Sequence, residues 1–148
     1  MYHFIVNPAS RSGQGAKYWN KIETYLKEHQ ISYNVHISTH GGHVAELMKE
    51  LTKDLTDDSE RIFVIVLGGD GTVNEALQGV LRFDKLTLGY IPTGSSNDLA
   101  RDLGIARDPI EALEHILYNP AFRLMDIGSL EYIDSLSDTT SWIKRHFI

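Results

Sequence analysis

An aspartate enclosed by glycines, in residues 68–71 (GGDG), is the clearest sign of chemistry in this sequence. Glycines leave backbone N–H groups uncovered, so a phosphate can approach the main chain without meeting a Cβ atom. A carboxylate beside a polyphosphate is repelled unless a cation lies between them. Asp70 therefore indicates a carboxylate that holds Mg²⁺, directly or through water, or one that removes a proton from an incoming hydroxyl.

The acidic residues of this region also have structural interpretations. Aspartate is common in glycine turns, so Asp70 could serve the turn alone. Thr72 and Glu75 have the spacing of a capping box, in which both side chains close the start of a helix. Asp98 suits the first turn of a helix capped by Ser95 or Ser96, where its charge would meet the helix dipole. For Asp98 we favour this structural role.

Other polar residues give weaker signals. The turn has neither the G-x-G-x-x-G spacing of dinucleotide folds nor the lysine of a G-x-x-x-x-G-K-[ST] loop. Arg11 and Lys17 could meet phosphate oxygens, although solvated charges explain them equally well. His40 and His43 have no third ligand at a suitable spacing, so we interpret them as solvated loop histidines rather than as a metal site.

Strands alternating with helices would position these residues. Apolar runs predict strands at 2–7, 33–38, 62–67 and 86–91, with a fifth at 122–128, and helical spacing predicts helices at 14–29, 44–55, 73–81, 97–103 and 109–118. The run IFVIVL (62–67) is apolar at every position and so predicts a central strand covered on both faces. Right-handed crossovers then give a three-layer α/β/α sandwich with a mainly parallel, Rossmann-like sheet.

The glycine-rich loops all follow predicted strands. They comprise residues 9–15, 39–42, 68–72 and 92–97. Because the carboxyl ends of parallel strands meet at one edge, and ligands of open α/β sheets bind in the crevice there, these loops should form one site.

Composition excludes several classes of protein. The formal charge of −6 argues against nucleic acid as a partner, since phosphate-backbone binding needs a basic surface. There is no cysteine, which excludes disulfides and thiolate zinc sites. No apolar run is long enough to span a bilayer and no signal-peptide pattern is present, so we expect a cytoplasmic protein. Any peripheral contact with a membrane would have to be local and apolar.

Three segments in this order carry a family resemblance: NPASRSGQG (7–15), GGDGTVNEAL (68–77) and PTGSSNDLAR (92–101). Together they resemble the catalytic domain of the diacylglycerol kinase family, within the wider group of lipid, sphingosine and NAD kinases. NAD kinases share GGDGT. The segment PTGSSNDLAR, however, is similar to the pattern P-x-G-T-x-N-D-x-A-R of the lipid kinases, which favours that branch.

The resemblance implies a site for ATP and Mg²⁺. Carried over by matching positions, it implies that ATP is contacted by Asn7, Thr39, Gly68, Gly69, Asp70, Gly71, Thr72, Val73, Asn74 and Ser95. Asp70 would be both the catalytic residue and the metal ligand. Ser95 stands where the family usually has threonine, and the hydroxyl is kept.

The resemblance covers residues 1–128, and it implies a domain boundary there. Family members continue into a second, mostly β domain, whereas residues 129–148 have no clean period and are expected to form an irregular tail, with the second domain absent. We expect the ATP-binding half of a lipid kinase that phosphorylates a lipid hydroxyl such as that of diacylglycerol. A nucleotide-binding module without transfer is the alternative, and NAD phosphorylation ranks third. A sheet surface left bare by the missing domain could drive homo-oligomerisation.

Overall fold

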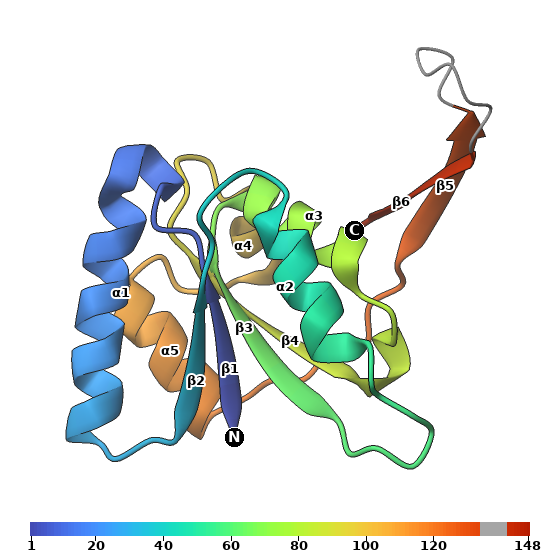
Figure 1. Ribbon diagram of the computed structural model, residues 1–148. Helices are drawn as coiled ribbons and strands as arrows, with labels where there is room; N and C mark the ends of the chain where they lie inside the picture. The colour runs from blue at the N-terminus through green and yellow to red at the C-terminus, as the bar shows by residue number, and fades with distance from the viewer. Residues whose placement is uncertain (134–141) are drawn as a thin grey trace.

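The computed structural model describes residues 1–133 and 142–148 (Figure 1). Its centre is a four-stranded parallel sheet made of β1 (Tyr2–Val6), β2 (Tyr33–Ile37), β3 (Ile62–Gly68) and β4 (Leu86–Pro92), in the order β2-β1-β3-β4. Val6 pairs with Leu67 and Gly68 with Pro92, so the strands end at one level. The four predicted strands and the parallel sheet are therefore confirmed.

Helices cover both faces of this sheet, as predicted for a three-layer sandwich (Figure 1). The helices α1 (Ser10–Glu28) and α5 (Pro109–Tyr118) pack on one face, and α2 (His43–Thr52) and α3 (Asp70–Gly79) pack on the other. The short helix α4 (Asp98–Leu103) adds Ala100 to the second core. A single 3₁₀ turn, η1 (Phe83–Lys85), precedes β4.

The central strand β3 holds the two cores together. Val64 and Val66 face the core under α2 and α3, while Ile65 and Leu67 face the core under α1 and α5; all four side chains are fully buried. Alternate residues of a strand point to opposite faces, so a strand that is covered on both sides must be apolar at every position. This is why IFVIVL lacks the usual alternation.

The first residues of α1 are not helical and form the loop that was expected at residues 9–15. Arg11, Ser12 and Gly13 have φ angles of 48°, 57° and 87°, so the regular helix begins only after Gly13. Left-handed backbone is easy for glycine and costly for other residues. The strain at Arg11 and Ser12 lies next to the carboxyl edge of the sheet, where functional loops are expected.

The prediction of a strand at 122–128 is wrong. Residues 120–127 have no regular structure, and β5 begins only at Gly128. Leu124, in the middle of the predicted strand, is 96% exposed, so the apolar residues of this segment do not reflect burial in the sheet. The segment instead leads from α5 to a separate pair of strands.

The irregular tail predicted at 129–148 is also contradicted where the structure describes it. There β5 (Gly128–Ile133) pairs antiparallel with β6 (Trp142–Phe147), while residues 134–141 lie outside the described part of the chain. This hairpin projects from the sandwich (Figure 1). The Gln78 side chain holds it, because its amide nitrogen donates to the His146 carbonyl (2.7 Å) and its amide oxygen accepts from the His146 N–H (3.0 Å). Two exposed strands lack a clean burial pattern, which explains the missed prediction.

A histidine pair on the neighbouring strands β1 and β2 is expected to make stability depend on pH. His3 and His36 are stacked with their ring centroids 5.8 Å apart, and His3 Nδ1 and His36 Nε2 are buried without a partner among the described residues. Burial lowers the pKa of both, and for His3 the nearby His36 and the N-terminal amine lower the pKa further. The unfolded chain therefore binds protons more readily as the pH falls through about 6.5, and stability is lost below that value.

The measurement is the urea midpoint at about pH 7.5 and about pH 5, on either side of the ordinary histidine pKa. We expect the midpoint to fall at the lower pH, and the fall to be smaller in His36→Phe, which keeps an aromatic ring on β2 but cannot be protonated. An equal fall in both proteins would contradict the role of this pair.

Candidate functional site

A cleft of about 460 Å³ lies at the carboxyl edge of the sheet, where the loops after β1, β3 and β4 meet. Hydroxyl, amide and glycine groups dominate its lining, which comprises Asn7, Ser10, Arg11, Gly69, Asp70, Gly71, Thr72, Glu75, Gly94, Ser95, Ser96 and Asn97. The predicted meeting of glycine-rich loops at one edge is therefore observed for three of the four loops. The fourth loop, residues 39–42, does not contribute to this lining.

Asp70 joins two of these loops through its carboxylate. Its Oδ2 accepts the N–H of Asp98 at 2.7 Å and its Oδ1 accepts the N–H of Leu99 at 3.3 Å. These N–H groups open α4, whose own flanking residue, Asn97, supplies no side-chain cap. The first N–H groups of a helix need outside acceptors and favour negative charge. Asp70, 28 residues upstream of Asp98, thus caps α4 from across the cleft.

The hydroxyl of Tyr90 is a third partner of Asp70. It lies 3.3 Å from Asp70 Oδ1 and 3.3 Å from Asn97 Oδ1, and the Tyr90 side chain is 6% exposed. Burial raises the pKa of Tyr90, and the Asp70 charge raises that pKa further. Tyr90 therefore remains a hydrogen-bond donor at neutral pH.

Three donors leave Asp70 with little spare capacity. A carboxylate offers about four acceptor positions, two on each oxygen. Oδ1 faces Tyr90 and Leu99, and Oδ2 accepts from Asp98, which leaves one position, on Oδ2. Any ligand, metal-bound water or proton donor must use that position or displace an existing partner.

The glycines of the site are required for two different physical reasons. A Cβ atom on Gly68 would overlap the Thr72 side chain, and one on Gly94 would lie 2.6 Å from the Cα of Gly69. These glycines allow the turn after β3 to pack against α3 and against the loop after β4. A Cβ on Gly71 would meet nothing within 4 Å, so Gly71 leaves the cleft open rather than the packing close.

Short polar side chains fasten the loops to one another. Asn7 donates from Nδ2 to the Thr72 hydroxyl (3.1 Å), joining the first loop to α3. The Ser10 and Thr93 hydroxyls lie 2.8 Å apart and are buried, which joins the first loop to the end of β4. Buried polar groups that are fully paired make a site rigid.

The capping box predicted for Thr72 and Glu75 is wrong. The helix α3 begins at Asp70 after Gly69, so Thr72 lies inside the helix, with its side chain 6% exposed. Glu75 Oε1 instead accepts the N–H of Val44 at 3.0 Å, in the first turn of α2. Because Gly42 before α2 has no side chain to act as a cap, a carboxylate from the neighbouring helix takes that role.

The structural role predicted for Asp98 is partly right. Asp98 is the first residue of α4, as expected, and its carboxylate forms an exposed ion pair with Arg101 (3.0 Å). Ser95 and Ser96 do not cap the helix, however, because Asn97 separates them from it. Asn97 adopts a left-handed backbone conformation (φ 53°). Its side-chain Oδ1 accepts the N–H of Gly94 and its Nδ2 donates to the Gly94 carbonyl, both at 2.9 Å.

The predicted site residues divide into two groups. Those that line the cleft are Asn7, Gly69, Asp70, Gly71, Thr72 and Ser95. Those outside it are Gly68 and Val73, which are buried, Asn74, which is exposed on α3, and Thr39, whose N–H donates to His43 Nδ1 (3.1 Å). Sequence reasoning did not select Ser10, Gly94 or Asn97. Ser10 lies in the glycine-rich loop 9–15, and Gly94 and Asn97 lie in the loop 92–97. Their position in these loops is the feature of the sequence that could have identified them.

Among the residues that the structure describes, no three histidine, aspartate or glutamate side chains are grouped closely enough to hold a metal ion. His40 and His43 are stacked, with ring centroids 4.8 Å apart, and are exposed or half-buried. In the same described ranges, no helix combines the length and the apolar character that a membrane crossing requires.

Comparison with known proteins identifies the family. Residues 1–130 match the diacylglycerol kinase catalytic domain, and the chain therefore belongs to that family. It is 32% identical over 127 residues to the diacylglycerol kinase of Bacillus subtilis (strain 168), covering 85% of this chain and 40% of that protein. It is also 32% identical over 136 residues to sphingoid long-chain bases kinase 1 of Arabidopsis thaliana, covering 87% of this chain and 17% of that protein.

A solved structure shows the same fold. The crystal structure of a diacylglycerol kinase from Bacillus anthracis str. Sterne superposes with a TM-score of 0.66 at 23% identity, covering 99% of this chain and 45% of the other. The chain thus spans less than half the length of each of these relatives. The family match fits the lipid branch that PTGSSNDLAR indicated.

Removing the Glu75 carboxylate is expected to weaken α2. Glu75→Ala leaves the N–H of Val44 without its acceptor and should lower the free energy of unfolding by about 1 kcal/mol. Glu75→Gln keeps an oxygen acceptor and should lose less. Urea unfolding of both variants is the measurement, and equal losses would show that the charge rather than the hydrogen bond matters.

Two glycine variants test the close approach of the loops. Gly94→Ala places a methyl group against Gly69 and should cost about 1–3 kcal/mol of folding free energy, because neither backbone can move freely. Gly71→Ala enters open space in a helix and should be neutral or stabilising by up to about 1 kcal/mol. Denaturant unfolding should separate the two; comparable stabilities would refute the packing assignment.

Proposed function

We propose that this chain is the nucleotide-binding half of an ATP- and Mg²⁺-dependent lipid kinase of diacylglycerol kinase type. It would bind ATP in the cleft at the carboxyl edge of the sheet, and the γ-phosphoryl group would pass to a lipid hydroxyl such as that of diacylglycerol. The observation that carries this proposal is the open first turn of α3, which begins at the Asp70 carboxylate, in a domain of this family.

The start of α3 suits phosphate oxygens. Thr72 and Val73 donate their N–H groups to the Gly69 carbonyl, which leaves the N–H groups of Asp70 and Gly71 for a ligand. The positive end of the helix dipole favours an anion there, and Gly71 presents no side chain to block it. The cleft lining also includes the positively charged side chain of Arg11. We therefore propose that Gly69, Asp70, Gly71, Asn7, Thr72 and Ser95 surround the phosphates.

Mg²⁺ fits this donor set when the nucleotide completes it. The ion is commonly held by one or two carboxylates together with phosphate oxygens and water. Asp70 is one such carboxylate, and its remaining acceptor position on Oδ2 suits a metal-bound water. When bound, Mg²⁺ would neutralise charge between the β- and γ-phosphates. Arg11 and the uncovered N–H groups would orient the same phosphates.

The transfer itself would make one bond and break another. The acceptor oxygen bonds to the γ-phosphorus, the bond from that phosphorus to the bridging oxygen breaks, and ADP leaves with its electron pair. The hydroxyl proton must go to a base or to water. Positioning and charge neutralisation supply most of the catalysis in such reactions, which suits a site of main-chain donors.

The remaining predicted contacts follow from the family pattern rather than from the cleft. Thr39 lies at the same edge of the sheet but does not line the cleft, and Gly68 and Val73 act here through packing. Asn74 is exposed on α3. A role of Thr39 or Asn74 in ATP binding stays a prediction. So does a cytoplasmic location with peripheral contact to a membrane.

A second function is favoured by one observation. Asp70 is the only aspartate of the cleft lining, and the glutamate there, Glu75, is engaged by α2. A module of this kind could bind nucleotide without transferring phosphate. NAD as the phosphoryl acceptor ranks lower, because the family match is to the lipid branch.

One experiment separates these functions. The protein is incubated with ATP, Mg²⁺ and diacylglycerol in mixed micelles, with NAD in a parallel reaction, and phosphorylated product and ATP affinity are measured on the same preparation. Lipid phosphate supports the kinase, whereas ATP binding without product supports the module. Absence of ATP binding would overturn both.

Asp70→Asn is expected to reduce transfer at least about a hundredfold, because it removes the negative charge that would hold Mg²⁺ beside the phosphates. One amide oxygen can still accept from α4, so the loss of folding free energy should be about 1–2 kcal/mol. The matched control is Asp102→Asn, an exposed carboxylate paired with Arg101. Rates and urea midpoints are compared; a stability loss large enough to explain the loss of rate would assign Asp70 to structure alone.

A further inference from the structure

Tyr90 places a hydroxyl group in an otherwise apolar core. Along β4, which the structure describes in full, the side chains that join the core under α2 and α3 are those of Leu86, Leu88 and Tyr90. The Tyr90 side chain is 6% exposed, and its residue pairs with the fully buried Val66 of β3. Phenylalanine would fill the same space, and a buried hydroxyl costs free energy unless it is hydrogen-bonded. The hydroxyl therefore indicates a role beyond packing.

Both acceptors of this hydroxyl belong to the walls of the cleft. The Tyr90 oxygen lies 3.3 Å from Asp70 Oδ1, at the start of α3, and 3.3 Å from Asn97 Oδ1, in the loop after β4. Asn97 is itself fixed, because its side-chain amide makes hydrogen bonds with the N–H and the carbonyl of Gly94. Tyr90 thus ties two walls of the cleft to the central sheet, and groups held by a strand are placed more precisely than groups held by loops alone.

The other two donors to Asp70 belong to a less firmly held element. They are the N–H groups of Asp98 and Leu99, which open α4, a helix of only six residues. A helix this short is not stable by itself, so these N–H groups move whenever α4 moves. Of the three donors that face Asp70, the Tyr90 hydroxyl is the one that comes from the sheet.

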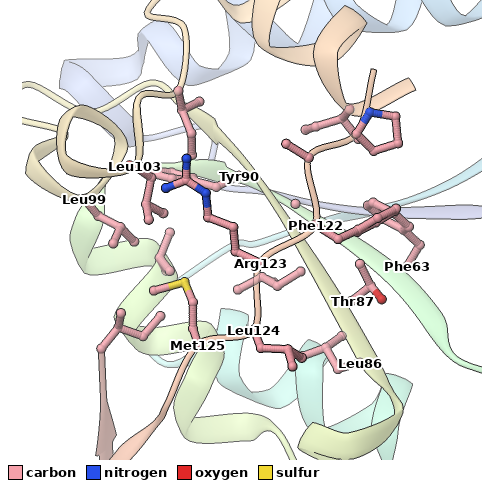
Figure 2. Close-up of a pocket in the computed structure, with 18 of the residues that line it drawn as sticks. Phe63, Leu86, Thr87, Tyr90, Leu99, Leu103, Phe122, Arg123, Leu124 and Met125 are labelled. Atoms are coloured by element: carbon pink, nitrogen blue, oxygen red, sulfur yellow. The ribbon is translucent and has the colours of Figure 1, made fainter. Parts of the chain in front are cut away.

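The Tyr90 contact distinguishes the two oxygens of the Asp70 carboxylate. Oδ1 faces the Tyr90 hydroxyl and the Leu99 N–H, and both of these residues also line an apolar cavity along β4 (Figure 2). Oδ2 accepts only from Asp98 and keeps an open acceptor position. The last torsion of an aspartate side chain is soft and nearly two-fold, so a carboxylate without such a contact readily exchanges its two oxygens.

We propose that Tyr90 is a positioning residue for the metal–nucleotide site, and that its hydroxyl orients Asp70 so that Oδ2 keeps its open position for Mg²⁺ or a metal-bound water. This inference rests on the proposed function, in which Asp70 receives the metal together with ATP. Tyr90 acts through Asp70 and Asn97, the two residues by which it reaches the cleft lining. A carboxylate that is oriented before the ligand arrives binds it at a lower entropic cost.

The test separates the binding of metal from the binding of phosphate. Calorimetry gives the affinity for ATP in Mg²⁺ and in EDTA, and the ratio of the two affinities is the metal enhancement. Arg11 and the main-chain N–H groups face the phosphates in both conditions, whereas Asp70 contributes favourably only when the metal is present. In Tyr90→Phe the affinity in EDTA should stay within about twofold of the native value. The metal enhancement should fall by about threefold to tenfold, which is the effect of one hydrogen bond.

Tyr33→Phe is the matched control. The Tyr33 hydroxyl donates to Glu23 Oε1 at 3.1 Å, so this change removes the same kind of contact from a tyrosine of the same sheet, on β2 and outside the cleft lining. Its metal enhancement should equal that of the native chain. Urea midpoints of both variants are measured alongside, and an equal fall of the enhancement in the two variants would overturn the inference.

Three further outcomes would also overturn it. A native chain that binds ATP equally well in Mg²⁺ and in EDTA holds no metal for Tyr90 to position. An enhancement in Tyr90→Phe that equals or exceeds the native one would show that Tyr90 does not orient Asp70, or that it competes with the metal for the carboxylate. Loss of ATP binding in EDTA in Tyr90→Phe would assign the hydroxyl to the fold of the cleft instead.

The inference and the proposed function fail separately. A reduced metal enhancement in Tyr90→Phe, together with no lipid phosphate in the micelle assay, would leave Tyr90 as a positioning residue of a nucleotide-binding module and remove the kinase function. Lipid phosphate from the native chain, together with an unchanged metal enhancement in Tyr90→Phe, would remove the role of Tyr90 and leave the kinase function.

Discussion

The contact between the Asp70 carboxylate and the start of α4 is the constraint on which the site depends. It joins the turn after β3 to the loop after β4, and both loops form walls of the cleft. The parallel sheet makes this contact possible, because β3 and β4 end at the same level, with Gly68 paired to Pro92. The small Gly69 and Gly94 then allow the two loops to approach closely. A helix of only six residues gains its cap from a distant carboxylate, since its own flanking residue provides none.

This constraint makes structure and chemistry compete for the same oxygen atoms. Three hydrogen-bond donors already face Asp70, and one acceptor position remains on Oδ2. A phosphate or metal at the cleft would therefore meet a carboxylate whose orientation is already fixed, which is how preorganised sites avoid the cost of rearrangement. The same geometry means that loss of Asp70 affects α4 as well as the ligand. A charge-removing variant that keeps an oxygen is thus more informative than a truncation.

The sequence predicts the sandwich and the edge of the sheet that carries the site, but not the contacts within the site. Strand and helix periods are local, and the fully apolar β3 identifies its own central position. The partners of Asp70 lie 20–29 residues away, and Glu75 caps a helix 31 residues upstream. Local spacing suggested a capping box for Glu75, and tertiary packing of α2 against α3 overrode it. The segment 122–128 failed for a related reason, because its apolar residues border a cavity instead of entering the sheet.

Tyr90 lies between the cleft and a second cavity, of about 720 Å³, that runs along β4. Its ring lines the cavity and its hydroxyl contacts both Asp70 and Asn97, so displacement of the ring by a ligand would also move a donor away from the carboxylate. Because Tyr90 is buried and remains protonated, that donor cannot be replaced by water without opening the wall. Loss of the donor would free a second acceptor position on Asp70, on the oxygen that also holds α4. The Tyr90 side chain is therefore a wall that the cavity and the cleft share.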